Sequence, residues 1–248
     1  MFTGKHVLVT GGSKGIGRSI VEAFAKGGAK VTFIYNTSNE KADDLTRWSA
    51  SHGYAVFSVK FDLVNIPLIS NLIDSIVAKN GEIDILINNA GVKIKTEFLS
   101  STEEDWDKTF EINLKSLYFV SQAVARYMSV CRKGKIINIS SQSGYRHVQS
   151  SIEYGLSKSG VAYLTISLAR ILSQYGITVN SLSPGRTYTD MTKYKEDAIR
   201  ERSAIENIPL GKINSAESIA SCVLFLASES ADNITGQILG VDGGEAVY

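Results

Sequence analysis

This 248-residue chain has few cysteines and prolines and almost no net charge. It has two cysteines and three prolines, and 26 basic residues against 25 acidic ones give a formal net charge of +1. Two cysteines cannot form a disulfide framework, and neither has His or Cys neighbours at zinc-ligand spacing. A nearly balanced charge gives no reason to expect a nucleic-acid or membrane-surface partner. We therefore expect a cytoplasmic protein without a metal site.

Long apolar runs are also missing. No stretch approaches the roughly 20 residues that a membrane-spanning helix needs. Strand-like residues begin at Lys5, so we expect no signal peptide. With 44% hydrophobic and 21% charged residues, the composition is that of a globular protein. A chain of this length can bury a full core without disulfides or metals.

Short apolar runs alternate with longer amphipathic segments almost from end to end. The strand candidates are Val7–Val9, Val31–Ile34, Val56–Val59, Ile83–Ile87, Lys135–Ile139, Ile177–Leu182 and Ile238–Val241. The helix candidates are Ile16–Lys26, Lys41–Ser51, Pro67–Lys79, Trp106–Met128, Lys158–Leu172 and Glu217–Leu226. Continuous Val/Ile/Leu strands between amphipathic helices are typical of a parallel sheet covered on both faces. The pattern predicts one α/β domain over residues 1–248, a Rossmann-like doubly wound parallel sheet of about seven strands with helices on both faces.

A glycine-rich turn follows the first strand candidate. Gly11, Gly15 and Gly17 open the next helix candidate, where free backbone N–H groups and the helix dipole favour an anion. In an alternating chain, this first junction is where dinucleotide-binding folds hold the cofactor phosphates. A tight turn without a ligand is the alternative. We predict that the turn binds a dinucleotide.

The end of the second strand candidate indicates which dinucleotide. An Asp or Glu at this place would hold the ribose 2′-hydroxyl of NAD, but the chain reads Tyr35-Asn36-Thr37-Ser38. Lys14, inside the glycine turn, could instead meet a 2′-phosphate. We predict NADP(H) in preference to NAD(H). The alternative is a solvated Lys14 and a site that accepts both cofactors.

Three polar residues are candidates for proton transfer. Tyr154 and Lys158 are four residues apart in a helical pattern, so they should share a face. A tyrosine has an ordinary pKa of about 10, and a neighbouring ammonium should lower it. Ser141 ends a strand candidate, at the edge where ligands bind in doubly wound sheets, and its hydroxyl could donate to a developing alkoxide.

Taken together, the motifs resemble those of the short-chain dehydrogenase/reductase family in its compact single-domain form. They are Thr10-Gly11-x3-Gly15-x-Gly17, Asp62-Leu63, Asn88-Asn89-Ala90-Gly91, Asn113, Ser141, Tyr154-x3-Lys158 and Pro184-Gly185 through Thr189. The similarity runs from residue 4 to 244 in order and spacing. It implies that Tyr154 protonates the carbonyl oxygen and that Lys158 holds the nicotinamide ribose and lowers the pKa of Tyr154. It implies also that Ser141 orients the carbonyl and that Asn113 anchors a water leading to solvent.

The resemblance further implies a set of cofactor-binding residues and an assembly. The candidate cofactor residues are Gly11, Ser13, Lys14, Gly15, Ile16, Gly17, Tyr35, Asn36, Thr37, Asp62, Leu63, Asn89, Ala90, Gly91, Pro184, Gly185, Thr187 and Thr189. Relatives are usually homotetramers that pair the helices corresponding to Trp106–Met128 and Lys158–Leu172. We therefore expect a homotetramer.

Within the family, the chain is most similar to bacterial 3-oxoacyl-acyl-carrier-protein reductases, through Gly176-Ile177-Thr178-Val179-Asn180 and Val241-Asp242-Gly243-Gly244. This implies a ketone or alcohol substrate that an acyl carrier protein could carry. Those reductases usually have an Arg where this chain has Tyr175. Arg146 and His147, in a segment that should face the substrate, suit a hydroxylated or anionic ketone better than a long acyl chain. The alternative substrate is therefore a sugar, polyol or surface-polysaccharide-precursor ketone.

The substrate site should lie between the reacting groups and a long aperiodic segment. The candidate substrate residues are Lys93, Gln142, Tyr145, Arg146 and His147. Residues 186–213 lack strong periodicity, and connections of that length usually form a lid or a binding loop. Enoyl reduction is disfavoured because enoyl reductases space their Tyr and Lys more widely. A non-catalytic NADP(H)-binding protein is disfavoured because all four reacting positions are intact.

Overall fold

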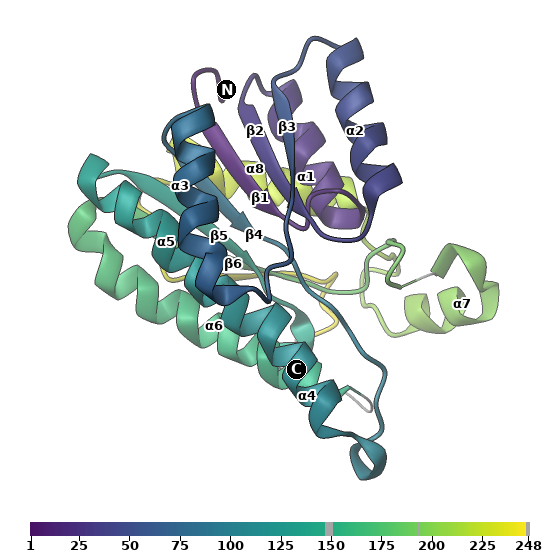
Figure 1. Ribbon diagram of the computed structural model, residues 1–248. Helices are drawn as coiled ribbons and strands as arrows, with labels where there is room; N and C mark the ends of the chain where they lie inside the picture. Colours follow the sequence, from purple (N-terminus) through teal and green to yellow (C-terminus); the bar gives the residue numbers. More distant parts are fainter. Residues whose placement is uncertain (147–150, 193, 247–248) are drawn as a thin grey trace.

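A parallel sheet of seven strands forms the centre of the molecule (Figure 1). The structure is a computed structural model that describes residues 1–146, 151–192 and 194–246. The strand order is β3-β2-β1-β4-β5-β6-β7, and every pairing is parallel. The strands are β1 (His6–Thr10), β2 (Lys30–Tyr35), β3 (Val56–Lys60), β4 (Ile85–Asn88), β5 (Gly134–Ile139), β6 (Ile177–Pro184) and β7 (Ile238–Val241). The predicted fold class and its seven strands are confirmed.

Helices cover both faces of this sheet. Helices α1 and α8 pack together on one face, and α3, α5 and α6 lie on the other (Figure 1). The helices are α1 (Gly15–Lys26), α2 (Asn39–Ser51), α3 (Ile69–Asn80), α4 (Glu103–Phe110), α5 (Ser116–Cys131), α6 (Ile152–Leu172), α7 (Ala198–Glu206) and α8 (Ala216–Ala227). In the described part of the chain, no helix is both long and apolar enough to cross a membrane.

The first strand shows why the strands are apolar without alternation. Val7 and Val9 pack into the core on the α1 and α8 side, whereas Leu8 between them packs into the core on the α3 and α5 side. Successive side chains of a strand point to opposite faces, and here both faces are covered. The same geometry brings the carboxyl ends of the strands to one edge, where the site lies.

Two predicted helix boundaries are wrong in ways that affect the site. The predicted helix over Trp106–Met128 is α4, a π-helical turn at Glu111–Lys115 and then α5. A capping box of Thr102 and Asp105 begins α4 before the apolar pattern starts. Helix α6 begins at Ile152 rather than at Lys158, so Tyr154 lies in its first turn.

The segment 186–213 is more ordered than its lack of periodicity suggests. It contains a 3-10 turn at Tyr194–Glu196 and the helix α7. The helix is polar, and of its described side chains only Ala204 is buried, so it shows no apolar face in the sequence. The Asp197 side chain caps it by accepting a hydrogen bond from the backbone N–H of Arg200 at 3.0 Å.

Candidate active site

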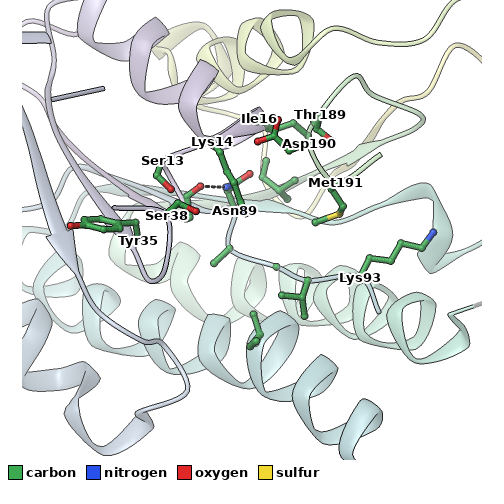
Figure 2. Close-up of a pocket in the computed structure, with 18 of the residues that line it drawn as sticks. Ser13, Lys14, Ile16, Tyr35, Ser38, Asn89, Lys93, Thr189, Asp190 and Met191 are labelled. Atoms are coloured by element: carbon green, nitrogen blue, oxygen red, sulfur yellow. Dashed lines mark hydrogen bonds between the residues drawn. The ribbon is translucent and has the colours of Figure 1, made fainter. Parts of the chain in front are cut away.

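A cavity of about 600 Å³ lies at the carboxyl ends of β1, β2, β4, β5 and β6 (Figure 2). Every candidate cofactor residue of the sequence analysis lines it. Other lining residues were not predicted, although most adjoin a motif residue: Ile34, Ser38, Phe61, Val92, Ile112, Ile139, Ser140, Asp190, Met191 and Thr192. The predicted set therefore lies around one cavity, at the edge of the sheet where doubly wound folds bind ligands.

The glycine turn is tied to the end of β4. The Asn89 side-chain amide donates to the carbonyl oxygens of Thr10 and Gly11, each at 3.0 Å. The Thr10 hydroxyl accepts in return from the backbone N–H groups of Asn89 and Ala90. A Cβ atom at Gly17 would collide with the Gly11 carbonyl oxygen and with Asn89. These residues fit the phosphates of a dinucleotide, because glycine leaves the backbone accessible at positions where a side chain would collide with its neighbours.

The surroundings of Lys14 bear on the choice between the two cofactors. Lys14 is exposed at the N-cap position of α1, and Tyr35 and Ser38 lie on the same side of the cavity (Figure 2). Among the described lining residues, the carboxylates are Asp62 and Asp190. Asp62 accepts from the backbone N–H of Val64 at 3.2 Å, and Asp190 pairs with Lys41. No carboxylate therefore follows β2 in the place that would select NAD.

Tyr154, Ser141 and Lys158 meet at the inner end of the cavity. Tyr154 and Ser141 are joined by a hydrogen bond between their side chains. The Lys158 ammonium is buried, donates to the Ile139 carbonyl oxygen at 2.8 Å and lies 5.8 Å from the centroid of the Tyr154 ring. The three candidates for proton transfer thus come together from the end of β5 and the start of α6.

The pKa of Tyr154 is not lowered as the sequence suggested. Burial raises the pKa of Tyr154, and the hydrogen bond with Ser141 opposes that rise only in part. Burial also lowers the pKa of Lys158 to about 8. The expectation was wrong because Lys158 directs its ammonium at the Ile139 carbonyl and because desolvation cannot be read from spacing. Tyr154 therefore holds its proton at neutral pH, which suits a group that donates to a carbonyl oxygen.

Asn113 lies behind the cavity rather than in its wall. It is fully buried in the π-helical turn, where its side chain donates to the Val92 carbonyl at 2.9 Å and to the Ser157 hydroxyl at 3.0 Å. Its side-chain oxygen accepts from the backbone N–H of Val92 at 2.8 Å. Asn113 thus holds the segment after β4 against α6. Single π-helical turns inside helices occur frequently at functional sites.

A second cavity, of about 1010 Å³, adjoins the first and shares Ser141 and Tyr154 with it. Of the candidate substrate residues, Lys93, Gln142 and Arg146 line it. Tyr145 is not among its lining residues, and its hydroxyl donates to the Ser183 hydroxyl at 2.8 Å. His147 lies outside the described residues. The lining residues that the candidate list missed are Lys95, Ser143, Ser151, Gly185, Arg186, Met191, Thr192, Tyr194, Arg200 and Glu245.

Glu245 connects the C-terminal end of the described chain to this second cavity. Its buried carboxylate accepts from Gln142 and from Arg186, each at 2.7 Å, and also from Arg146. Burial alone would raise the pKa of Glu245, but the three hydrogen bonds hold that pKa below its usual range. The carboxylate fixes two arginines at the cavity wall. Among the described residues, no group of three or more His, Cys, Asp or Glu side chains could hold a metal ion.

The sheet, the glycine turn and the Tyr–Lys–Ser cluster define a Rossmann-like oxidoreductase. Comparisons with known proteins agree. A family model described as Enoyl-(Acyl carrier protein) reductase matches residues 11–245. The chain is 36% identical over 241 residues to the 3-oxoacyl-(acyl-carrier-protein) reductase FabG of Thermotoga maritima, covering 97% of each chain.

Solved structures show the same relationship. A gluconate 5-dehydrogenase of Burkholderia cenocepacia in complex with NADP and tartrate is 32% identical, with a TM-score of 0.93 over 100% of this chain and 97% of that one. A variant of actinorhodin polyketide ketoreductase with NADPH is 28% identical, with a TM-score of 0.93 and full coverage of both chains. The chain belongs to the short-chain dehydrogenase/reductase family, and it is an oxidoreductase that acts on CH–OH and C=O groups.

Proposed function

We propose that this protein is an NADP(H)-dependent carbonyl reductase whose first candidate substrate is a 3-oxoacyl group carried by an acyl carrier protein. The observation that supports it best is the hydrogen-bonded Tyr154–Ser141 pair beside a glycine-lined cavity that carries no NAD-selecting carboxylate. Its curated relative from Thermotoga maritima is named for this reaction. A cytoplasmic location follows from this function.

Each reacting residue has one task in the proposed reaction. The nicotinamide supplies the hydride when it is bound. Ser141 donates to the carbonyl oxygen and orients it, and Tyr154 gives that oxygen its proton. Lys158 would hold the ribose hydroxyls of the cofactor, and Asn113 would anchor a water leading from Lys158 to solvent. Gly11, Gly15 and Gly17 let the backbone approach the pyrophosphate, and Lys14 meets the 2′-phosphate.

A second candidate substrate is a polar ketone of the sugar or polyol type, including a surface-polysaccharide precursor. The second cavity favours it, because Lys93, Arg146 and Arg186 stand where an acyl chain would need apolar walls. A similar solved structure is named a gluconate 5-dehydrogenase.

Turnover with paired cofactors tests the proposed function. We expect oxidation of NADPH with acetoacetyl thioesters or with keto-sugars, at a kcat/KM at least about tenfold above that with NADH, because Lys14 provides a charged partner for the 2′-phosphate. Steady-state kinetics with a panel of thioesters, keto-sugars and small diketones would measure both properties. The Lys14→Ala variant should lose most of the preference, whereas Lys26→Ala, at the other end of α1, should keep it. A higher kcat/KM with NADH would refute the cofactor assignment.

We also propose a homotetramer. Helices α5 and α6 expose large apolar side chains, among them Tyr118, Tyr163 and Ile166, in the region where relatives pair. Light scattering at micromolar concentration should give four times the chain mass. Ile166→Glu should lower that mass, whereas Ile199→Glu on α7, where the side chain is more exposed still, should leave it unchanged. A monomeric wild-type protein would contradict the assembly.

A further inference from the structure

Basic side chains dominate the second cavity. The lysines and arginines that line it are Lys93, Lys95, Arg146, Arg186 and Arg200, and the one carboxylate among the described lining residues is Glu245. Glu245 pairs with Arg146 and Arg186. Lys93, Lys95 and Arg200 have no carboxylate within ion-pair distance in the described ranges. The cavity therefore holds more positive than negative charge, although the whole chain is almost neutral.

One of the unpaired cations, Lys93, stands close to the reacting groups. The Lys93 ammonium lies 5.4 Å from the centroid of the Tyr154 ring, and Lys93 lines both cavities. Lys93 and Met191 lie at the end of the first cavity away from Tyr35 (Figure 2). Arg200, from α7, stacks on the Tyr194 ring at 5.3 Å, which fixes the direction of its guanidinium. An anion held by these two side chains would lie beside the oxygen that Tyr154 protonates.

The like charges work against one another in the protein without substrate. Desolvation lowers the pKa of Lys93, and the charges of Arg200 and Arg186 lower that pKa further. Such a cluster costs stability unless a counter-ion joins it, so it is typical of a site that binds an anion. No described carboxylate supplies that counter-charge, since Glu245 already accepts from Gln142, Arg146 and Arg186.

We infer that Lys93 and Arg200 bind an anionic group of the substrate, a carboxylate or a phosphate, a short distance from the carbonyl that is reduced. The inference rests on the proposed carbonyl–alcohol function and favours its second candidate substrate. Arg200 suits either anion, because its planar guanidinium can donate two parallel hydrogen bonds. Lys93 adds a point charge on the side of the cavity next to Tyr154. Arg186 is paired with Glu245 and forms part of the cavity wall between Lys93 and Arg200.

Pairs of ketones that differ in charge test this inference. We expect NADPH-dependent turnover of D-fructose 6-phosphate, dihydroxyacetone phosphate or 5-keto-D-gluconate to exceed that of neutral D-fructose, dihydroxyacetone and acetoacetyl-N-acetylcysteamine. Lys93→Gln and Arg200→Gln should each lower kcat/KM for the anionic ketone about ten- to a hundredfold, the range for one charged hydrogen bond. Turnover of the neutral partner should fall less, so the ratio of kcat/KM for the anionic ketone to that for the neutral ketone should drop. Arg202→Gln, exposed on the same helix and outside the cavity lining, is the matched control.

Binding of a small dianion gives a readout that needs no turnover. Calorimetry with tartrate and the NADP⁺-saturated protein should show binding that weakens about tenfold or more in Lys93→Gln and Arg200→Gln but not in Arg202→Gln. Equal effects of these variants on neutral and anionic ketones, or tartrate binding that none of them changes, would overturn the inference. Absence of turnover with every ketone, including the thioester, would instead count against the proposed function, and tartrate binding would still decide whether the anion subsite exists.

Discussion

Replacing Tyr154 with phenylalanine should lower kcat for carbonyl reduction about 10²- to 10⁴-fold, the usual contribution of a positioned general acid. The substitution removes the hydroxyl that Ser141 contacts and keeps the ring against Lys93 and Lys158. Burial raises the pKa of Tyr154, so the residue is neutral at the working pH and carries the proton that phenylalanine lacks. Affinity for NADPH, measured by fluorescence titration, should stay within about threefold, since the glycine turn is untouched.

The control for this variant lies on the same helix. Tyr163→Phe makes the same chemical change at an exposed side chain of α6, so it should leave kcat unchanged. If Tyr154→Phe kept nearly full turnover on every ketone that the wild type reduces, the proton would have to come from another group. If NADPH binding fell together with turnover, the hydroxyl would serve the cofactor site rather than the chemistry.

The sequence was most informative where a feature is local. Val7 to Val9 and the glycines that follow them are contiguous, and the geometry of a strand running into a helix is set by those residues themselves. Tyr154 and Lys158 are related by helical spacing, so their common face could be predicted. Prediction failed where burial decides: the shift in the pKa of Tyr154 depends on residues that spacing does not reveal.

Long-range charge pairing was also beyond the sequence. Glu245 and Arg146 are 99 positions apart, and nothing in the motif around Val241-Asp242-Gly243-Gly244 indicates that the next carboxylate turns inward. Tyr145 and Arg146 are neighbours, yet only Arg146 lines the second cavity, whereas the Tyr145 hydroxyl donates to Ser183. Arg200 lies on a helix whose polar sequence shows no apolar face. Several residues around the second cavity are thus the ones that the tertiary structure had to reveal.

Replacing Lys158 with methionine should separate activity from stability. Turnover is expected to fall about 10²-fold or more, because the ammonium beside Tyr154 and the ribose partner disappear together. The free energy of unfolding at neutral pH should be unchanged or higher, because methionine fills a similar buried volume without a desolvated charge. The variant gives up the hydrogen bond to the Ile139 carbonyl, which offsets part of that gain.

The sign of the pH dependence follows from the pKa of Lys158, which burial lowers from 10.5 to about 8. Between these values the unfolded chain binds a proton that the folded protein has released, so this group makes wild-type stability rise as pH increases through that window. The free-energy cost of the buried Lys158 charge is fully present below about pH 8, where it is on the order of 3 kcal/mol at most. Lys158→Met should lack this rise, so urea unfolding at pH 7 and pH 9.5 should show the stability of the variant relative to wild type falling at the higher pH. The opposite result would be a loss of stability in Lys158→Met that is larger at pH 7 than at pH 9.5. It would show that Lys158 stabilises the fold as a cation. The buried charge would then have to be balanced by a partner other than the Ile139 carbonyl.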